Sequence, residues 1–362
     1  MAKKIRTLDQ WEKEHRKKQE EAIRTILPLY ATSILPLVQI GLGYGYEPGD
    51  DNEFFTFNMQ PKGMKEAKEA LSEVNQKVTD IIIAGMVAQW KLSNRKNDAF
   101  IRMTMHNPPS RYLQDNAERM RKFVSRKVNG LQLSERVWKC TDQYRAQIED
   151  AITLGIKQGK SANAIAKDIR NYLVEPDRLY RRIRDEFGEL RLSESAKSYH
   201  PGQGVYRSSY QNAIRLAQTE IGIAYCESDY LRWQQDDRIV GIRIKTSPEH
   251  AAWLAKDWYP RFKKGTAPLE ICDQMEGVYP KDFRFVLWHP NCHCSHEPIY
   301  LSGSIDSDIL LTTPKPIEKT PAMFNKYLVQ NKSRITSASN RGKLPYWIKA
   351  NGKFTDIQGK NG

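Results

Sequence analysis

The amino-acid sequence predicts a mainly α-helical protein with a small α+β module. The N-terminal two-thirds are expected to be helical, followed by a C-terminal module with a short antiparallel sheet and by an extended tail. Two observations predict this class. Apolar residues recur at three- and four-residue spacing over long stretches before residue 235, and they alternate every second residue only in two short stretches after it. With 362 residues and 40% hydrophobic content, the chain can bury two or three domain cores.

Residues 1–62 are predicted to form an N-terminal arm. Within it, residues 25–46 contain no charged side chain, which superficially resembles a membrane span or a signal peptide. Pro28 and Pro36 should interrupt a helix here, and several polar residues dilute the hydrophobicity. We therefore expect no membrane span, but a segment that is buried or docks on a partner, followed by a loop over residues 47–62.

Residues 63–192 are predicted to form a helical domain. The clearest helix carries an apolar stripe at alternating three- and four-residue spacing, made of Met64, Ala67, Leu71, Val74, Val78, Ile81, Gly85 and Ala88. Such a stripe is typical either of a coiled coil between subunits or, more often, of packing inside a helical domain. We favour packing inside the domain and keep the coiled coil as the alternative.

A second set of helices is expected after a break at residues 107–109. Helical patterns resume over residues 111–158, and Ser161 has the position of an N-cap for a further helix that ends before Pro176. The string from Gly155 to Ser161 resembles a phosphate-binding loop. It has only three residues between its glycines and follows a helical pattern, so we reject a nucleotide site there.

Residues 205–300 are predicted to form the α+β module, after a linker over residues 193–207. A long helix should present one apolar face, with Glu220 on the opposite face as a surface residue that forms a salt bridge. Alternation then predicts strands around residues 240–244 and over residues 283–288. Residues 301–362 are predicted to be a basic, proline-containing tail with one short helix after Thr320-Pro321, fraying from Asn351 onward.

Positive charge is concentrated in two segments of a chain whose formal net charge is +14. Residues 95–139 hold eleven Lys or Arg against four Asp or Glu, and residues 312–362 hold ten against two. Such segments indicate either contact with a polyanion or a solvated basic face. The candidate nucleic-acid-binding residues are Arg119, Arg121, Lys122, Arg126, Lys127, Arg341, Lys343, Lys349 and Lys353.

Cysteine and histidine gather between residues 250 and 296. This stretch contains three of the five Cys and four of the seven His, which is typical of a site rather than of a disulfide framework. Thiolate and imidazole are the ligands that zinc prefers, so the sequence predicts a possible zinc site formed by Cys272, His289, Cys292 and Cys294. The alternative is that the cysteines are small buried hydrophobic residues.

The histidines of this stretch also suggest an HNH-type nuclease. It would use His289, Asn291 and His293, but these lie within five residues, whereas the motif of such nucleases is spread over a ββα hairpin. No separated pair of acids supports an enzyme either, since Asp273 is typical of a turn. We therefore predict that the protein is not an enzyme.

Several of these residues together resemble the phage Mu F-like head morphogenesis family. They are the helix Ala213-Ile-Arg215-Leu-Ala217-Gln-Thr219-Glu220, His250 after the next strand, Cys272-Asp273 with Gly277, and the closing His289-Pro290-Asn291-Cys292-x-Cys294 with Pro298. The resemblance covers residues 205–300. Met275 replaces the second Cys of the family's Cys-Asp-x-Cys turn, and His293 replaces an Arg. The loss of that Cys weakens a four-thiolate site, although His289 or His293 could substitute.

The resemblance implies a minor structural protein of a bacteriophage head. It would act in head morphogenesis near the portal, be made in the host cytoplasm, and be a low-copy part of the virion. Its implied partners are the portal protein, other capsid proteins and packaged DNA. Two alternatives stay open from the residues themselves: a metal-dependent nuclease and a zinc-stabilised nucleic-acid-binding module.

Overall fold

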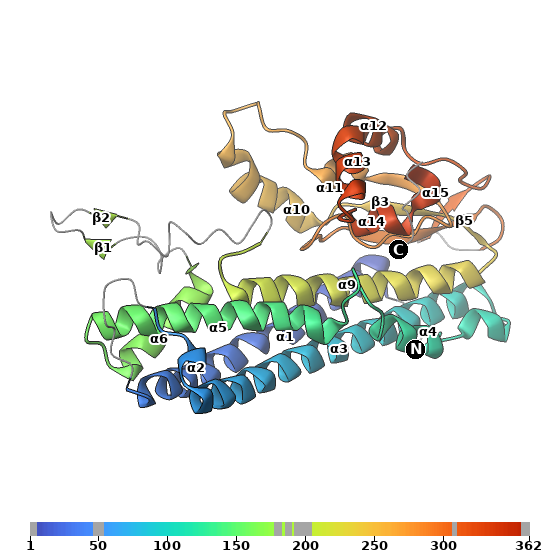
Figure 1. Cartoon of the computed structure of the whole chain (residues 1–362). Coiled ribbons are helices and arrows are strands. Elements are labelled where there is room, and N and C mark those ends of the chain that lie inside the picture. The colour runs from blue at the N-terminus through green and yellow to red at the C-terminus, as the bar shows by residue number, and fades with distance from the viewer. Residues whose placement is uncertain are drawn as a thin grey trace. The chain divides into compact units, whose positions relative to one another are not determined.

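The computed structural model describes residues 6–45, 54–176, 183–184, 190–191, 205–305 and 310–355 (Figure 1). The chain forms two compact units assembled from segments that are distant in the sequence. The first unit comprises residues 1–19, 86–123 and 219–362, and the second comprises residues 20–85 and 124–218. These units differ from the four consecutive regions expected from the sequence. The difference arises because the helices over residues 8–24, 61–104 and 209–235 each contribute residues to both units.

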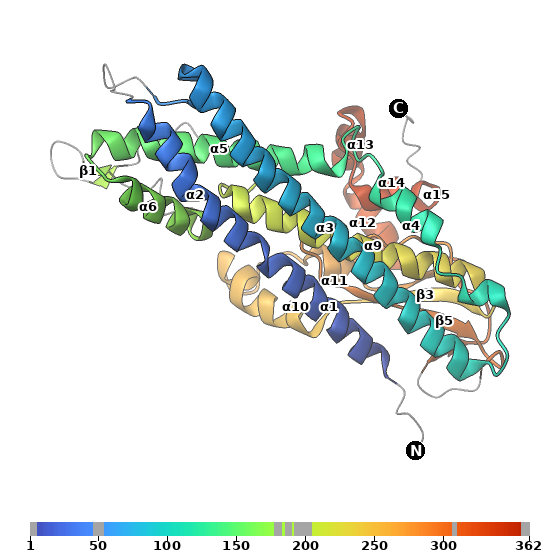
Figure 2. The same ribbon diagram turned by 90° about the horizontal axis from the view of Figure 1, so that it is seen from below.

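Helices dominate the first two-thirds of the chain, as predicted. Figure 2 shows the third of them as one long, uninterrupted helix. The predicted break after it and the predicted long helix of the module are both present. The helices of this part are α1 (Leu8–Arg24), α2 (Ile26–Gly43), α3 (Pro61–Thr104), α4 (Ala117–Val124), α5 (Leu133–Lys157), α6 (Ala162–Val174) and α9 (Ser209–Gln235).

The core of the second unit lies where α2, α5 and α6 pack together. Two glycines permit this close approach. A Cβ at Gly41 of α2 would lie 2.6 Å from Ile152 Cδ1, and a Cβ at Gly155 of α5 would lie 2.3 Å from Ile165 Cδ1. Ser161 caps α6 as predicted, because its hydroxyl accepts a hydrogen bond from the backbone N–H of Ala164 at 3.3 Å.

The charge-free segment is helical, and the expectation that its prolines would interrupt a helix is wrong. Pro28 lies in the first turn of α2, where its missing N–H costs no hydrogen bond. Pro36 lies inside the helix and removes one. Burial offsets this loss, since one side of α2 is buried through Ile26, Tyr30, Ile34, Leu37, Val38 and Gly41.

One helical stretch of the described residues, Leu8–Gly43, is long and apolar enough to cross a membrane by length and composition alone. A core helix passes the same test, and 33% of the apolar window is buried against the rest of the protein. This stretch is therefore weak evidence for a membrane span.

The apolar stripe on α3 packs inside the protein, although not along the whole predicted seam. Ala67, Leu71, Val74 and Val78 are buried, whereas Ala88 at the end of the stripe is exposed. The buried side moves to Ile82, Met86, Gln89 and Trp90. A straight helix with 3.6 residues per turn drifts away from a seven-residue repeat by about 20° each heptad, which explains the shift.

Helix α9 is covered on more sides than the sequence indicated. Every residue from 219 to 229 is buried, including Glu220 with 2% of its surface exposed. The expectation that Glu220 is a surface residue is therefore wrong. A helix buried all round cannot be recognised from one apolar stripe, because its polar residues are also enclosed.

The small sheet of the first unit contains β4 (Gly277–Pro280), β3 (Ile239–Lys245), β5 (Ser295–Leu301) and β6 (Leu311–Thr313), in that order. Strand β3 pairs antiparallel with both β4 and β5, whereas β6 pairs parallel with β5. The predicted antiparallel sheet is thus a mixed sheet. A separate two-residue pair joins β1 (Ile183–Arg184) to β2 (Leu190–Arg191).

The predicted strand over residues 283–288 is absent. Five of its six residues, all but Arg284, are buried irrespective of the alternation, and Leu287 adopts a left-handed conformation with φ of 68°. The Asn351 side chain satisfies this backbone instead of a neighbouring strand. Its amide oxygen accepts from the N–H of Arg284 at 2.8 Å, and its Nδ2 donates to the carbonyl of Arg284 at 2.9 Å.

The tail is folded rather than extended, which corrects the prediction of one short helix. Phe324, Ile335, Trp347 and Ile348 are buried in the first unit, and their burial holds the segment in place. Its helices are α12 (Ala322–Gln330), α13 (Lys332–Asn340), α14 (Tyr346–Ala350) and α15 (Gly352–Thr355). Most of the predicted linker at 193–207, part of the loop at 47–62 and the end of the tail lie outside the described residues.

Candidate metal centre

A tight turn before β5 brings two of the predicted ligands together. The N–H of Cys292 donates to the carbonyl of His289 at 3.1 Å, which closes a four-residue turn. Pro290 presets φ at the second position, and Asn291 has φ of 63° at the third. Proline followed by a residue with positive φ is the pattern of a type II turn, and Asn tolerates that conformation better than most residues.

The third ligand comes from the short helix α11 (Ile271–Met275). Glu270 caps this helix, because its carboxylate accepts a hydrogen bond from the N–H of Cys272 at 2.6 Å. The cap places the Cys272 thiol, which is 2% exposed, opposite the turn.

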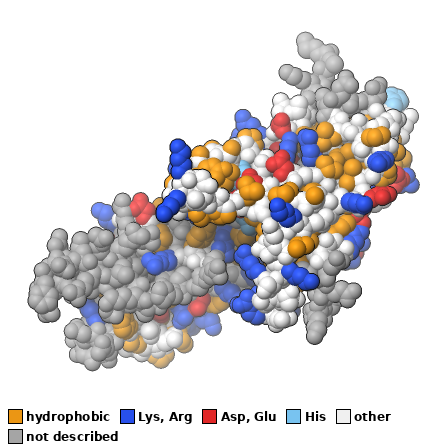
Figure 3. All heavy atoms as spheres, turned by 90° about the horizontal axis from the view of Figure 1, so that it is seen from above, with side chains coloured by type: hydrophobic (Ala, Val, Ile, Leu, Met, Phe, Trp, Pro, Cys, Tyr) orange, Lys and Arg blue, Asp and Glu red, His pale blue; other side chains and the backbone are white. Residues whose placement is uncertain are grey.

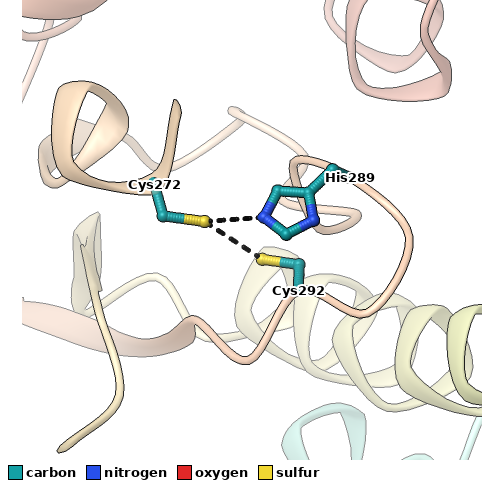
Figure 4. Close-up of side chains that lie close together, drawn as sticks. All are labelled: Cys272, His289 and Cys292. Carbon is teal, nitrogen blue, oxygen red and sulfur yellow. Dashed lines mark hydrogen bonds between the residues drawn. The ribbon is translucent and has the colours of Figure 1, made fainter. Parts of the chain in front are cut away.

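The three side chains converge on one point (Figure 4). Cys272 Sγ lies 3.1 Å from His289 Nε2 and 3.7 Å from Cys292 Sγ. The three ligand atoms lie within 4.8 Å of one another. Cys272, His289 and Cys292 therefore form a cluster that could hold a metal ion.

Hydrogen bonding orients the imidazole of His289 for this role. Its Nδ1 lies 2.8 Å from the carbonyl oxygen of Pro290, to which it can only donate. The lone pair of a neutral ring is then on Nε2, which faces Cys272. Metal-binding histidines are commonly oriented by such a bond on the other ring nitrogen.

The cysteines of the cluster differ in how readily their thiols ionise. Burial opposes ionisation of Cys292, but hydrogen bonds from the thiols of Cys272 and Cys294 hold its pKa well below the ordinary value. Hydrogen bonds to Cys292 and Cys294, together with burial, raise the pKa of Cys272. These hydrogen bonds thus favour the thiolate of Cys292, and thiolate is the form that binds a metal.

The structure brings together three of the four predicted ligands and places the fourth beside them. The Cys294 thiol lies close enough to those of Cys272 and Cys292 to affect their ionisation, but it does not belong to the three-ligand group. Of the two histidines that could replace the missing cysteine at Met275, His289 lies in the cluster. Met275 itself is fully buried in the core.

A buried polar network in the first unit was not predicted from the sequence. Lys96 Nζ lies 2.5 Å from Asp229 Oδ2, and His296 Nε2 lies 3.0 Å from the same oxygen. Lys96, Asp229 and His296 are at most 3% exposed. No local pattern marks Lys96 as buried, because its neighbours in the sequence are polar and its partner Asp229 is 133 residues away.

A groove with a volume of about 940 Å³ adjoins the cluster and includes His289 and Glu270 in its lining. Lys326, Arg334 and Lys343 line it, together with the aromatic residues Trp258, Trp288, Tyr327, Tyr346 and Trp347. On the face drawn in Figure 3, Lys and Arg side chains lie among hydrophobic ones. Of the predicted nucleic-acid-binding residues, Lys343 is part of this groove.

The other predicted basic residues lie on several elements. Arg119, Arg121 and Lys122 are exposed on α4, where Lys122 pairs with Glu118 at 2.6 Å. Lys353 pairs with Asp282, so part of its charge is already balanced. The remaining members are Arg126 and Lys127 after α4, Arg341 after α13 and Lys349 on α14; Arg126 is half-buried and the other three are exposed.

Comparison with known proteins adds no identification: no protein-family model, no curated protein and no solved structure matches this chain.

Proposed function

We propose that this chain is a minor structural protein of a bacteriophage head. It would act in head morphogenesis near the portal and contact packaged DNA or portal and capsid proteins. One observation carries the proposal. The closing motif His289-Pro290-Asn291-Cys292-x-Cys294, on which the resemblance to the Mu F-like family mainly rests, forms a turn that supplies two ligands of the candidate metal centre.

Zinc is the ion that we propose for this centre. Two thiolates and an imidazole are ligands that zinc prefers, and the neighbouring Cys294 thiol could supply a fourth. In a tetrahedral site with Zn–S bonds of about 2.3 Å, two sulfurs lie about 3.8 Å apart. The sulfurs of Cys272 and Cys292 are 3.7 Å apart, which fits this requirement.

The role proposed for zinc is structural. The cluster connects α11 to the turn before β5, two segments of the module that are 20 residues apart. A zinc ion with four protein ligands has no open position for a substrate, which suits a structural protein.

The protein composition of purified phage heads tests this proposal. In a phage that encodes this chain, mass spectrometry of purified heads should detect it at a fixed low copy number relative to the major capsid protein. Co-expression with the portal protein from the same genome should yield a complex that survives gel filtration. Absence from heads and failure to bind the portal would contradict the proposal.

A zinc-stabilised nucleic-acid-binding module is the second candidate. The groove favours it, since three cationic side chains and several aromatic rings line one depression. This candidate predicts steeply salt-dependent binding of the isolated protein to DNA, in a protein that is absent from heads.

A further inference from the structure

We infer that a second site for a divalent cation lies beside the cysteine cluster, formed by His250, Glu270 and Asp273. Its ligands would be one imidazole nitrogen and two carboxylate oxygens, which lie within 4.8 Å of one another. This inference goes beyond the proposed function, because it requires neither the phage head nor zinc.

Two helices hold the three ligands in position. His250 belongs to α10 (Pro248–Trp253), whose N-cap Ser247 accepts a hydrogen bond from the N–H of His250 at 3.2 Å. Glu270 and Asp273 are three residues apart at the start of α11, a spacing that places two side chains on the same side of a helix. His250 Nε2 lies 2.9 Å from Asp273 Oδ1.

The two carboxylate oxygens of Glu270 have different surroundings, and one of them could bind a metal ion. Its Oε2 caps α11 through the N–H of Cys272. Its Oε1 lies 3.5 Å from His289 Nε2, between the two groups of ligands. The same carboxylate thus holds Cys272 in the cysteine cluster and faces the second site.

The charge balance favours a cation here. Within the part of the chain that the structure describes, neither carboxylate forms an ion pair with Lys or Arg. Asp273 lies beside His250, and Glu270 lies beside His289, whose imidazoles are not fixed positive charges. The Glu270 and Asp273 side chains are only 10% and 26% exposed. Partly buried carboxylates without a fixed positive partner are costly, and a divalent cation would supply that partner.

The ligand set indicates which kind of ion would bind. Carboxylate oxygens with imidazole suit Mn²⁺ and similar first-row ions, whereas the thiolates of the neighbouring cluster suit zinc. Three protein ligands would leave coordination positions for water. The two sites therefore differ in metal preference and can be measured separately.

The test is a titration of the full-length protein with Mn²⁺, carried out with and without one equivalent of Zn²⁺ and followed by the EPR signal of the free ion. Wild type should bind one Mn²⁺ per chain. Asp273→Asn and His250→Gln should each weaken this binding by more than about tenfold, since even changes outside the ligand shell commonly cost 10–100-fold.

Glu249→Gln is the matched control. It removes one acidic charge next to His250, at a side chain that is 60% exposed and outside the ligand set, and should leave Mn²⁺ affinity within about twofold. In Co²⁺-substituted protein, sulfur-to-cobalt absorption from the cysteine cluster should persist in Asp273→Asn, showing that the module is folded. Wild type that binds no Mn²⁺, or ligand variants that bind it as wild type does, would overturn the inference.

Discussion

One lysine of the first unit has no access to water. Lys96 is 1% exposed, and its ammonium group lies 2.5 Å from Asp229 and 3.6 Å from Glu12. Ser93 and Asn97 each donate to Asp229 Oδ1 at 2.7 Å. Buried charges persist only when such partners replace water.

Removing the lysine should leave Asp229 charged and without its main partner. We expect Lys96→Met to lower the free energy of unfolding by about 3–5 kcal/mol. Urea denaturation measures this, with Lys91→Met on the exposed side of the same helix as the control. Equal stability of the two variants would contradict the prediction. Adding Asp229→Asn to Lys96→Met should recover part of the loss.

The same network predicts a pH dependence. Burial alone would raise the pKa of Asp229, but Lys96 and His296 hold it well below its ordinary value. A carboxyl group with a depressed folded-state pKa stabilises the protein above its unfolded pKa of about 3.9, and this contribution disappears as the pH falls. The stability difference between wild type and Lys96→Met should therefore narrow between pH 7 and pH 3. A constant difference would contradict this account.

At the scale of elements, an asparagine replaces a strand partner. The segment over residues 283–288 has the alternation of a strand, yet the Asn351 side chain makes the hydrogen bonds of Arg284. Asn351 is 2% exposed. The alternation was misleading because aromatic residues bury both sides of the segment.

Asn351→Ala should leave the part-buried N–H and C=O of Arg284 without their present partners. A buried unsatisfied group costs about 1–3 kcal/mol, so we expect the free energy of unfolding to fall by about that amount. Thermal or urea denaturation measures the change, and Asn340→Ala at an exposed position is the control. If Asn351→Ala and Asn340→Ala both have the same free energy of unfolding as wild type, the fold of residues 283–288 does not depend on Asn351.

At the scale of the whole molecule, the proposed zinc should stabilise the fold. Elemental analysis should give one zinc per chain for wild type and none for Cys292→Ser, whereas Cys140→Ser, outside the cluster, should retain it. An ion at 100 times its dissociation constant contributes about 2.7 kcal/mol, so chelation should lower Tm by about 5–10 °C. Zinc lost with Tm unchanged would indicate an open rather than a structural site. Absence of metal from wild type would leave the cysteines as core residues.

Sequence by itself determined the local features of this protein. Periodicity placed α3 and α9, residue type placed the Ser161 cap, and the spacing of Cys and His indicated a candidate metal centre. These features depend on neighbours within a few turns of chain, which a sequence displays directly.

Tertiary structure alone decided which distant residues meet. It joined Lys96 to Asp229, enclosed Glu220, assigned Asn351 to the backbone of Arg284, folded the tail and aligned β6 parallel to β5. It also left Cys294 outside the three-ligand group and placed Glu270 between two groups of ligands. Burial and charge pairing depend on what covers a residue from elsewhere in the chain, and no local pattern records that.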